Sequence, residues 1–183
     1  GDAVTTGGDN VYIGGETGGA ATTGTNNVAV GRAALVTQTT ASNNVAIGSN
    51  ALYANTTGTQ NVAVGKDAGL SLTTATYTTL IGAFAGDAIT TGTFNTAVGG
   101  ASLTANTTGA NNTAVGTSAL ASNSTASNNT ALGFEALATN STGARQTAVG
   151  SLALDAITTG TDSTAIGYNA LGAHGCCFCS CRF

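Results

Sequence analysis

Apolar, small and polar residues recur along the chain in a pattern with a strict period of 17 residues. The clearest marker is a glycine that follows an apolar residue, as in the stretch 95–99, Asn-Thr-Ala-Val-Gly. A sequence repeat with so strict a period is typical of a chain that folds into stacked, identical backbone turns. We therefore number each unit from its glycine, as positions 1 to 17, and expect each unit to form one coil of a solenoid. The ten glycines, which no insertion or deletion displaces, are Gly14, Gly31, Gly48, Gly65, Gly82, Gly99, Gly116, Gly133, Gly150 and Gly167.

Two short segments of each unit, at positions 4 to 7 and 14 to 17, have the alternation of a strand, and turns rich in Asn, Thr and Gly separate them. We expect each strand to pair in parallel with its copies in the neighbouring coils. The predicted fold is all-β: a parallel β-solenoid (β-roll) of ten 17-residue coils without helices, roughly 48 Å long at about 4.8 Å per coil. Residues 1–173 form the predicted solenoid domain, which begins with a partial coil, and residues 174–183 form a Cys-rich terminal segment that fills the last coil.

Strand alternation also predicts which columns of side chains face the interior. Position 17 is apolar in all ten units, so we expect it to point inward together with position 15, which is Val in the first three units and Thr in the next six. The expected interior is locally altered where Gly18, Gly69 and Gly86 replace the usual leucine of position 5. The leucines that should close the core from this side are Leu35, Leu52, Leu103, Leu120, Leu137, Leu154 and Leu171.

Position 16 should then point outward, yet it is Ala in eight of the ten units. Uniformly small residues on an outer side suggest the close approach of another surface. Recent gene duplication would also leave this column uniform, although positions 2, 3, 6 and 13 vary freely. We expect a self-assembly face between copies of the chain, formed by Ala29, Ala46, Ala63, Ala97, Ala114, Ala131, Ala148 and Ala165.

Polar columns predict hydrogen bonding along the rod. Thr or Ser at positions 9 and 10 should serve turns, because their hydroxyl groups bond to nearby backbone groups. Asn55, Asn106, Asn123 and Asn140, all at position 8, lie in Asn-x-Ser/Thr sequons. Neighbouring glycans only about 5 Å apart would crowd each other, so we favour a turn-forming role for these residues. A ladder of stacked amides is expected at position 14 from Asn27, Asn44, Asn61, Asn95, Asn112 and Asn129.

Composition argues against several classes of function. The formal net charge is -4 and only four residues are Lys or Arg, so we expect no nucleic acid binding. No apolar run approaches the roughly 20 residues of a membrane helix, so we expect no membrane insertion. The carboxylates are scattered over different positions and the only histidine is His174, so we expect no enzyme, metal or cofactor. The chain opens with Gly1 rather than Met, so we interpret it as a mature or excised piece.

All four cysteines of the chain lie in its last ten residues: Cys176, Cys177, Cys179 and Cys181. On an extended strand three of them would share one face, where they could form disulfides or cap the end of the rod. A metal cluster with His174 is a weaker alternative, because the usual C-x2-C pairs are absent. An artefact in the sequence of this segment is a third explanation.

The motifs Asn-Val-Ala-Ile-Gly at 44–48 and Asn-Val-Ala-Val-Gly at 61–65 resemble the YadA-like head repeats of trimeric autotransporter adhesins. The Ala-Leu and Asn-Thr-Thr-Gly segments are also similar to repeats of phage-type and environmental fibre proteins. The resemblance covers nearly the whole chain, to about Ala173. It implies a left-handed parallel β-roll, assembly as a trimer, and surface attachment or a fibre function with matrix proteins or glycans as ligands.

The sequence therefore predicts a non-enzymatic structural or adhesive fibre module that is extracellular or lies on a cell or virion surface. The expected partners are copies of the chain itself, in a trimer or filament, and a surface protein or glycan. The alternative is an ice-binding β-solenoid that displays rows of threonine. Against it, the paired threonines lie in a predicted turn beside glycine, and not as Thr-x-Thr on a flat strand.

Overall fold

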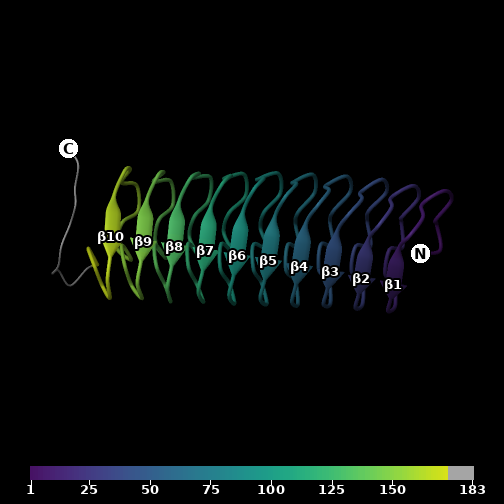
Figure 1. The fold of residues 1–183 in the computed structure, drawn as a ribbon, viewed down its shortest axis with the longest axis horizontal. Helices are drawn as coiled ribbons and strands as arrows, with labels where there is room; N and C mark the ends of the chain where they lie inside the picture. The colour runs from purple at the N-terminus through teal and green to yellow at the C-terminus, as the bar shows by residue number, and fades with distance from the viewer. Residues whose placement is uncertain (173–183) are drawn as a thin grey trace.

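The structure is a computed structural model that describes residues 1–172, and it shows an all-β solenoid with one strand per coil (Figure 1). Ten parallel strands form a single sheet in chain order, and residues 1–172 contain no helix. The predicted parallel solenoid with 17-residue coils is confirmed, whereas the hand of the coiling stays a prediction. The strands are β1 (Val11–Ile13), β2 (Val28–Val30), β3 (Val45–Ile47), β4 (Val62–Val64), β5 (Thr79–Ile81), β6 (Thr96–Val98), β7 (Thr113–Val115), β8 (Thr130–Leu132), β9 (Thr147–Val149) and β10 (Thr164–Ile166).

The register of the sheet follows the repeat directly. Each residue pairs with the residue 17 positions further along, as in Val11 with Val28 and Thr96 with Thr113. Equivalent residues of successive coils therefore stack in straight columns along the rod (Figure 1). Side chains at the same position of successive coils therefore lie next to one another and can form a continuous row.

The second predicted strand, at positions 4 to 7, is wrong. This part of every coil is a series of turns, in which residues at positions 3 and 5 have positive φ, for example 53° at Ala101 and 55° at Leu103. A residue in the left-handed region cannot continue an extended strand. The backbone still links the coils here, since the Leu103 N–H donates to the Ala119 carbonyl at 2.9 Å.

The glycine at position 1 has two structural reasons to recur. Its φ lies near 130°, and is 136° at Gly99, a region that side chains disfavour. A Cβ atom added to Gly99 would also lie 2.5 Å from the carbonyl oxygen of Gly116 in the next coil. The marker of the repeat is therefore a point after the strand where successive backbones lie too close together for a side chain to fit.

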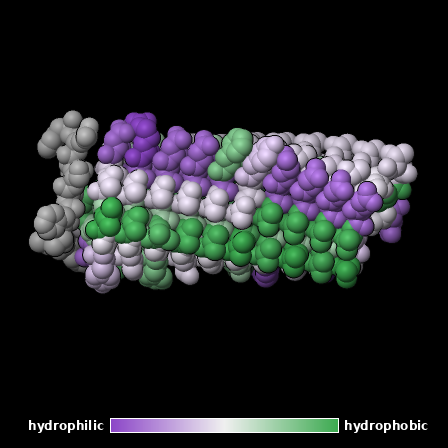
Figure 2. All heavy atoms as spheres, viewed as in Figure 1, coloured by the Kyte–Doolittle hydropathy of each residue, from purple (hydrophilic) through white to green (hydrophobic). Residues whose placement is uncertain are grey.

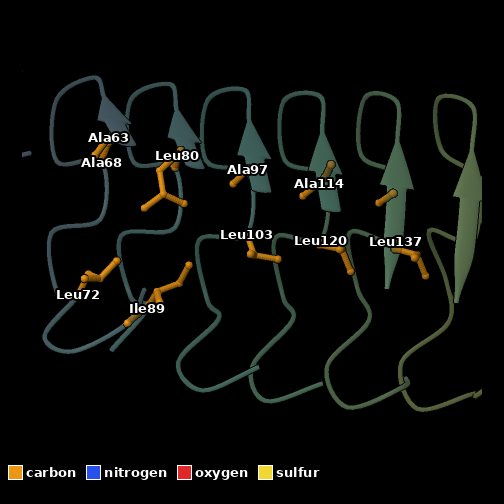
Figure 3. Close-up of a cluster of buried hydrophobic side chains, with 14 of the residues drawn as sticks. Ala63, Ala68, Leu72, Leu80, Ile89, Ala97, Leu103, Ala114, Leu120 and Leu137 are labelled. Carbon is orange, nitrogen blue, oxygen red and sulfur yellow. The ribbon is translucent and has the colours of Figure 1, made fainter. Parts of the chain in front are cut away.

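The interior of the rod is narrow and is filled by alanine and leucine. Ala97 and Ala114 of the strands are fully buried, as are leucines of position 5 such as Leu103 and Leu120 (Figure 3). Positions 15 and 17 point the other way, so the predicted orientation of the strand is wrong. The physical reason is space, because the strand lies so close to the returning turns that only a small side chain fits between them in most coils.

Two larger residues at position 16 are matched by glycine at position 5, which confirms the altered interior expected there. Leu80 replaces alanine, and a Cβ atom on Gly69 or Gly86 would lie within 2.8 Å of its side chain. Tyr12 lies against Gly18 in the same manner. The larger side chain at position 16 thus fills the space that glycine leaves at position 5, as close packing requires.

The predicted asparagine ladder at position 14 is confirmed. The Asn112 side chain donates to the Ala126 carbonyl at 2.9 Å, and its Oδ1 accepts from the backbone N–H of Asn129 at 3.0 Å. Both bonds join one coil to the next, and Asn112 is fully buried. A buried backbone group left without such a partner would cost about 1–3 kcal/mol, which explains why asparagine recurs.

Candidate interaction faces

The outer side of the ten-stranded sheet carries a continuous apolar surface. Every residue at positions 15 and 17 of the strands is at least partly exposed, with 40% exposure at Ile81 and 47% at Leu132. We call these two columns the sheet face. The column at position 17 consists of Ile13, Val30, Ile47, Val64, Ile81, Val98, Val115, Leu132, Val149 and Ile166.

The sheet face has two zones that differ at position 15. This position is valine in β1 to β4 and threonine in β5 to β10. Figure 2 shows the result as one row of hydrophobic side chains along the whole rod and a second row beside it towards the N-terminal end. Threonine keeps the β-branched shape of valine, so the face stays regular while its polarity changes.

The predicted self-assembly face of alanines lies in the wrong place. Ala29, Ala46, Ala63, Ala97, Ala114, Ala131 and Ala148 are 0% exposed and Ala165 is 1% exposed, so none of them can contact another chain. Their uniformity comes from the narrow interior. The residues directly before and after each alanine are the ones that reach the surface, because successive side chains of a strand point to opposite sides.

The paired hydroxyl residues at positions 9 and 10 have different roles. At position 9 the hydroxyl group donates to the backbone carbonyl of the same position in the next coil, as Thr73 does to Thr90 at 3.1 Å and Thr107 to Ser124 at 3.1 Å. The expected bonding of hydroxyl to backbone is confirmed at position 9, where it joins coils to one another.

At position 10 the threonine is exposed in each coil from Thr6 to Thr159. Within residues 1–172, no hydroxyl group of this column has a hydrogen-bond partner in the protein. The predicted turn-serving bond of this second threonine is therefore not seen. The column consists of Thr6, Thr23, Thr40, Thr57, Thr74, Thr91, Thr108, Thr125, Thr142 and Thr159.

Position 12 adds a second column of hydroxyl groups beside position 10. The residue between them, at position 11, is Gly or Ala and is buried in most coils, for example at Gly58, Ala75 and Gly92. Positions 10 and 12 therefore both lie on the outer side, and we call them together the hydroxyl face. The hydroxyl-bearing residues at position 12 are Thr25, Ser42, Thr59, Thr76, Thr93, Ser127 and Thr161.

The sequons are unsuitable for glycan attachment in the folded chain. Asn55, Asn106, Asn123 and Asn140 are all 0% exposed. Each side chain bonds within its own turn; the Asn140 amide, for example, donates to the Gly143 carbonyl at 2.8 Å and its Oδ1 accepts from the Gly143 N–H. The turn-forming role predicted for these residues is confirmed.

Charged and aromatic side chains lie mainly on the column at position 13 and on the corner after the strand. Tyr77 and Phe94, at position 13 of neighbouring coils, stack with their ring centroids 5.3 Å apart. Arg145 and Asp162 form an ion pair at 2.6 Å on the same column, and the hydrogen bond from Arg145 lowers the pKa of Asp162. Both charged side chains are exposed, so the pair contributes little to stability.

Residues 1–172 show no cluster of three or more His, Cys, Asp or Glu residues that could hold a metal ion. The same residues include no helix of the length and apolar character that crossing a membrane requires. The predicted disulfide or end-cap residues Cys176, Cys177, Cys179 and Cys181 lie outside the described residues, as does His174.

Comparison of the chain with protein-family models, with curated proteins and with solved structures finds no match.

Proposed function

We propose that this chain is a non-enzymatic extracellular structural or adhesive fibre module whose copies associate through the sheet face. The observation that carries the proposal is the uninterrupted column of exposed or partly exposed Val, Ile and Leu at position 17, which spans all ten strands. Contiguous apolar surface of this kind is uncommon on monomeric proteins and marks sites of association. Burying it would release free energy roughly in proportion to the apolar area removed from water.

A second copy of the chain is the partner that this surface fits best. The side chains of the sheet face repeat once per strand, at about 4.8 Å, over roughly 45 Å. A partner can interdigitate along this whole length only if its own side chains repeat with the same spacing, which another copy provides. Positions 15 and 17 also carry no charged residue, so copies with the same negative net charge meet there without direct repulsion.

The extracellular location and the adhesive role are supported by the resemblance to adhesin head repeats at 44–48 and 61–65. In such a module, the intercoil hydrogen bonds give a stiff rod, and association joins rods into a trimer or a filament. The column at position 13, where Asn, Gln, Tyr, Phe, Arg and Asp all occur, is the surface on which a protein or glycan ligand would find the most varied side chains.

The test compares the mass of the purified chain in solution with that of two matched variants. Ile47→Glu with Ile81→Glu places two charges on the sheet face, where both residues are 40% exposed. We expect this variant to remain folded by circular dichroism and to sediment as a monomer of 17.5 kDa, while the unaltered chain sediments as an oligomer. Negative-stain imaging then distinguishes a trimer from a filament.

The control variant, Tyr53→Glu with Phe84→Glu, removes equally exposed apolar side chains away from the sheet face, at 41% and 40% exposure. Its backbone tolerates the change, because Glu135 occupies the position of Phe84 with a positive φ in another coil, and Asp87 that of Tyr53. We expect this control to keep the mass of the unaltered chain. An unaltered chain that is monomeric at all concentrations, or a control that dissociates equally, would contradict the proposal.

A further inference from the structure

We infer that the hydroxyl face binds ice. This inference is independent of the fibre proposal, because it uses a different surface of the coil, formed by positions 10 and 12 instead of positions 15 and 17. It rests on three observations: the uniformity of the exposed threonine column, the lack of a protein partner for its hydroxyl groups, and the two-dimensional regularity of the array.

The first observation is that folding does not explain the threonine at position 10. The neighbouring position 9 also keeps a hydroxyl group, but there the group bonds to the next coil, as in Thr73 and Thr90. At position 10 the fold makes no such use of the side chain in residues 1–172, yet threonine recurs in ten successive coils. Side chains at other exposed positions, such as 2 and 13, vary freely in the same coils. The constraint on position 10 therefore comes from something outside the chain.

The second observation concerns the chemistry that the hydroxyl face presents. Within residues 1–172 its residues are Thr, Ser, Ala and Gly, with no charged and no aromatic side chain in either column. Such a surface cannot attract an ion or a charged polymer, and it has no ring on which a sugar could stack. A threonine offers a methyl group, around which water orders, and a hydroxyl group, which can both donate and accept a hydrogen bond. Water itself is the partner that matches both properties.

The third observation is that the array is regular in two directions. Along the rod the hydroxyl groups repeat with the coils, at about 4.8 Å, and across it the rows at positions 10 and 12 run side by side on the outer side. Ice is a lattice whose oxygen atoms also repeat at fixed spacings in two directions. Thr91 and Thr93 of one coil, with Thr74 and Thr76 of the coil before, form one cell of this array.

The array is also held rigidly, which lattice matching requires. The backbone N–H of Thr74 donates to the Thr90 carbonyl at 3.4 Å, and that of Phe94, just after position 12, donates to the Thr76 carbonyl at 3.1 Å. Ser42 and Ser127 use their hydroxyl groups additionally to accept from the preceding coil, at 3.0 and 2.9 Å. A solid partner with a fixed repeat can therefore form many weak contacts with this face at once, and binding does not carry the entropic cost of ordering a flexible surface.

The test measures thermal hysteresis and inhibition of ice recrystallisation by the purified full chain. We expect the unaltered chain to lower the freezing point below the melting point and to shape ice crystals. Thr91→Tyr with Thr108→Tyr breaks the array at its centre, and Thr91→Lys with Thr108→Lys does so by charge. We expect both variants to lose most of the hysteresis while circular dichroism and mass in solution stay unchanged, which separates this effect from any change in assembly.

The matched control is Asn111→Tyr with Asn128→Tyr, at exposed position 13, where Tyr77 shows that tyrosine is accepted. It should keep the hysteresis of the unaltered chain. The inference is overturned if the unaltered chain has no hysteresis, or if the control loses as much as the threonine variants. It is also overturned if only Thr96→Tyr with Thr113→Tyr abolishes hysteresis, because the sheet face would then be the one that binds ice.

Discussion

Leu80 shows how a single exchange in one column is accommodated by exchanges in another. It stands where eight of the ten strands have alanine, and it is fully buried. Its side chain occupies the space that leucines at position 5 fill in other coils, where Gly69 and Gly86 stand instead (Figure 3). The total side-chain volume in the interior thus stays similar, although the volume at position 5 or position 16 alone varies between coils. The free energy of unfolding should therefore depend on the combination of residues at the two positions.

This compensation predicts strong energetic coupling between Leu80 and Gly86. Leu80→Ala alone should cost about 2–5 kcal/mol, because it opens a cavity. Gly86→Leu alone should also destabilise, because its Cβ would lie 2.7 Å from the Leu80 side chain. In the double variant the new leucine fills the cavity, so we expect denaturant unfolding to show a favourable coupling of about 1 kcal/mol or more. Coil nine already combines Leu154 with Ile157, so a leucine beside Ile89 is acceptable.

The control cycle pairs Gly86→Leu with Leu137→Ala, a cavity three coils further along the rod. These two sites share no contact, so their free-energy changes should add. Additive behaviour of the Leu80 and Gly86 changes as well would mean that the facing columns do not exchange volume, contrary to our interpretation.

At the scale of the strand, alternation predicted which residues share a side but not which side is inside. Positions 15 and 17 oppose position 16, and hydrophobicity alone placed Val98 inward and Ala97 outward. In the structure Ala97 points inward and Val98 outward. The coil is so narrow that most strands accommodate only alanine at position 16, and no single segment of the sequence encodes this width. One signal was present in the sequence: Leu80 at position 16 accompanies Gly69 and Gly86 at position 5, as expected only for columns that face each other.

In the turns, too, some features could be predicted from the sequence and others could not. The roles of Asn112 at position 14 and Asn140 at position 8 followed from their side-chain chemistry and recurrence. The sequence could not show that the predicted second strand at positions 4 to 7 is absent. Leucine rarely adopts the left-handed backbone conformation, and at Leu120 hydrogen bonds to the neighbouring coil hold the backbone in it. The different roles of positions 9 and 10 could not be predicted from the sequence either, because both positions are threonine in most coils.

The valine and threonine zones of the sheet face predict how its affinity can be tuned. Thr79→Val with Thr96→Val extends the second apolar column beyond β4, through β5 and β6, without changing side-chain shape. If copies bury this face against each other, the added apolar contact should tighten association. A gain of about 1.4 kcal/mol would appear as a roughly tenfold lower dissociation constant in sedimentation equilibrium.

The control for this change is Thr91→Val with Thr108→Val, the same chemical exchange on the hydroxyl face. It should leave the dissociation constant unchanged, because this surface lies outside the proposed contact. If the two double variants tighten association equally, the effect is one of general hydrophobicity and the assignment to the sheet face is wrong.

At the scale of the whole molecule, each inner coil interacts with the coil before it and the coil after it. Hydrogen bonds run both ways: the Val28 N–H donates forward to the Asn44 carbonyl at 2.8 Å, and the Gly31 N–H donates back to Ile13 at 2.8 Å. Stability in such an assembly is approximately a sum over repeats and their interfaces. Because the sheet is parallel and each pairing spans 17 residues, the number of coils can change while the register cannot.

This property predicts opposite outcomes for two deletions that differ by one residue. Removing residues 100–116 joins Gly99 to Thr117 and takes out one complete coil, so every later residue keeps its column. We expect the shortened chain to retain its circular dichroism spectrum and to lose only a few degrees in melting temperature, as expected for one repeat of many. Removing residues 100–115 shifts every later residue by one position, which turns Ala131 outward, moves Thr130 into the narrow interior and places Leu132 at the tight position of the glycine. That chain should fail to fold beyond the deletion, as measured by limited proteolysis, and equal behaviour of the two deletions would contradict a register fixed by the 17-residue coil.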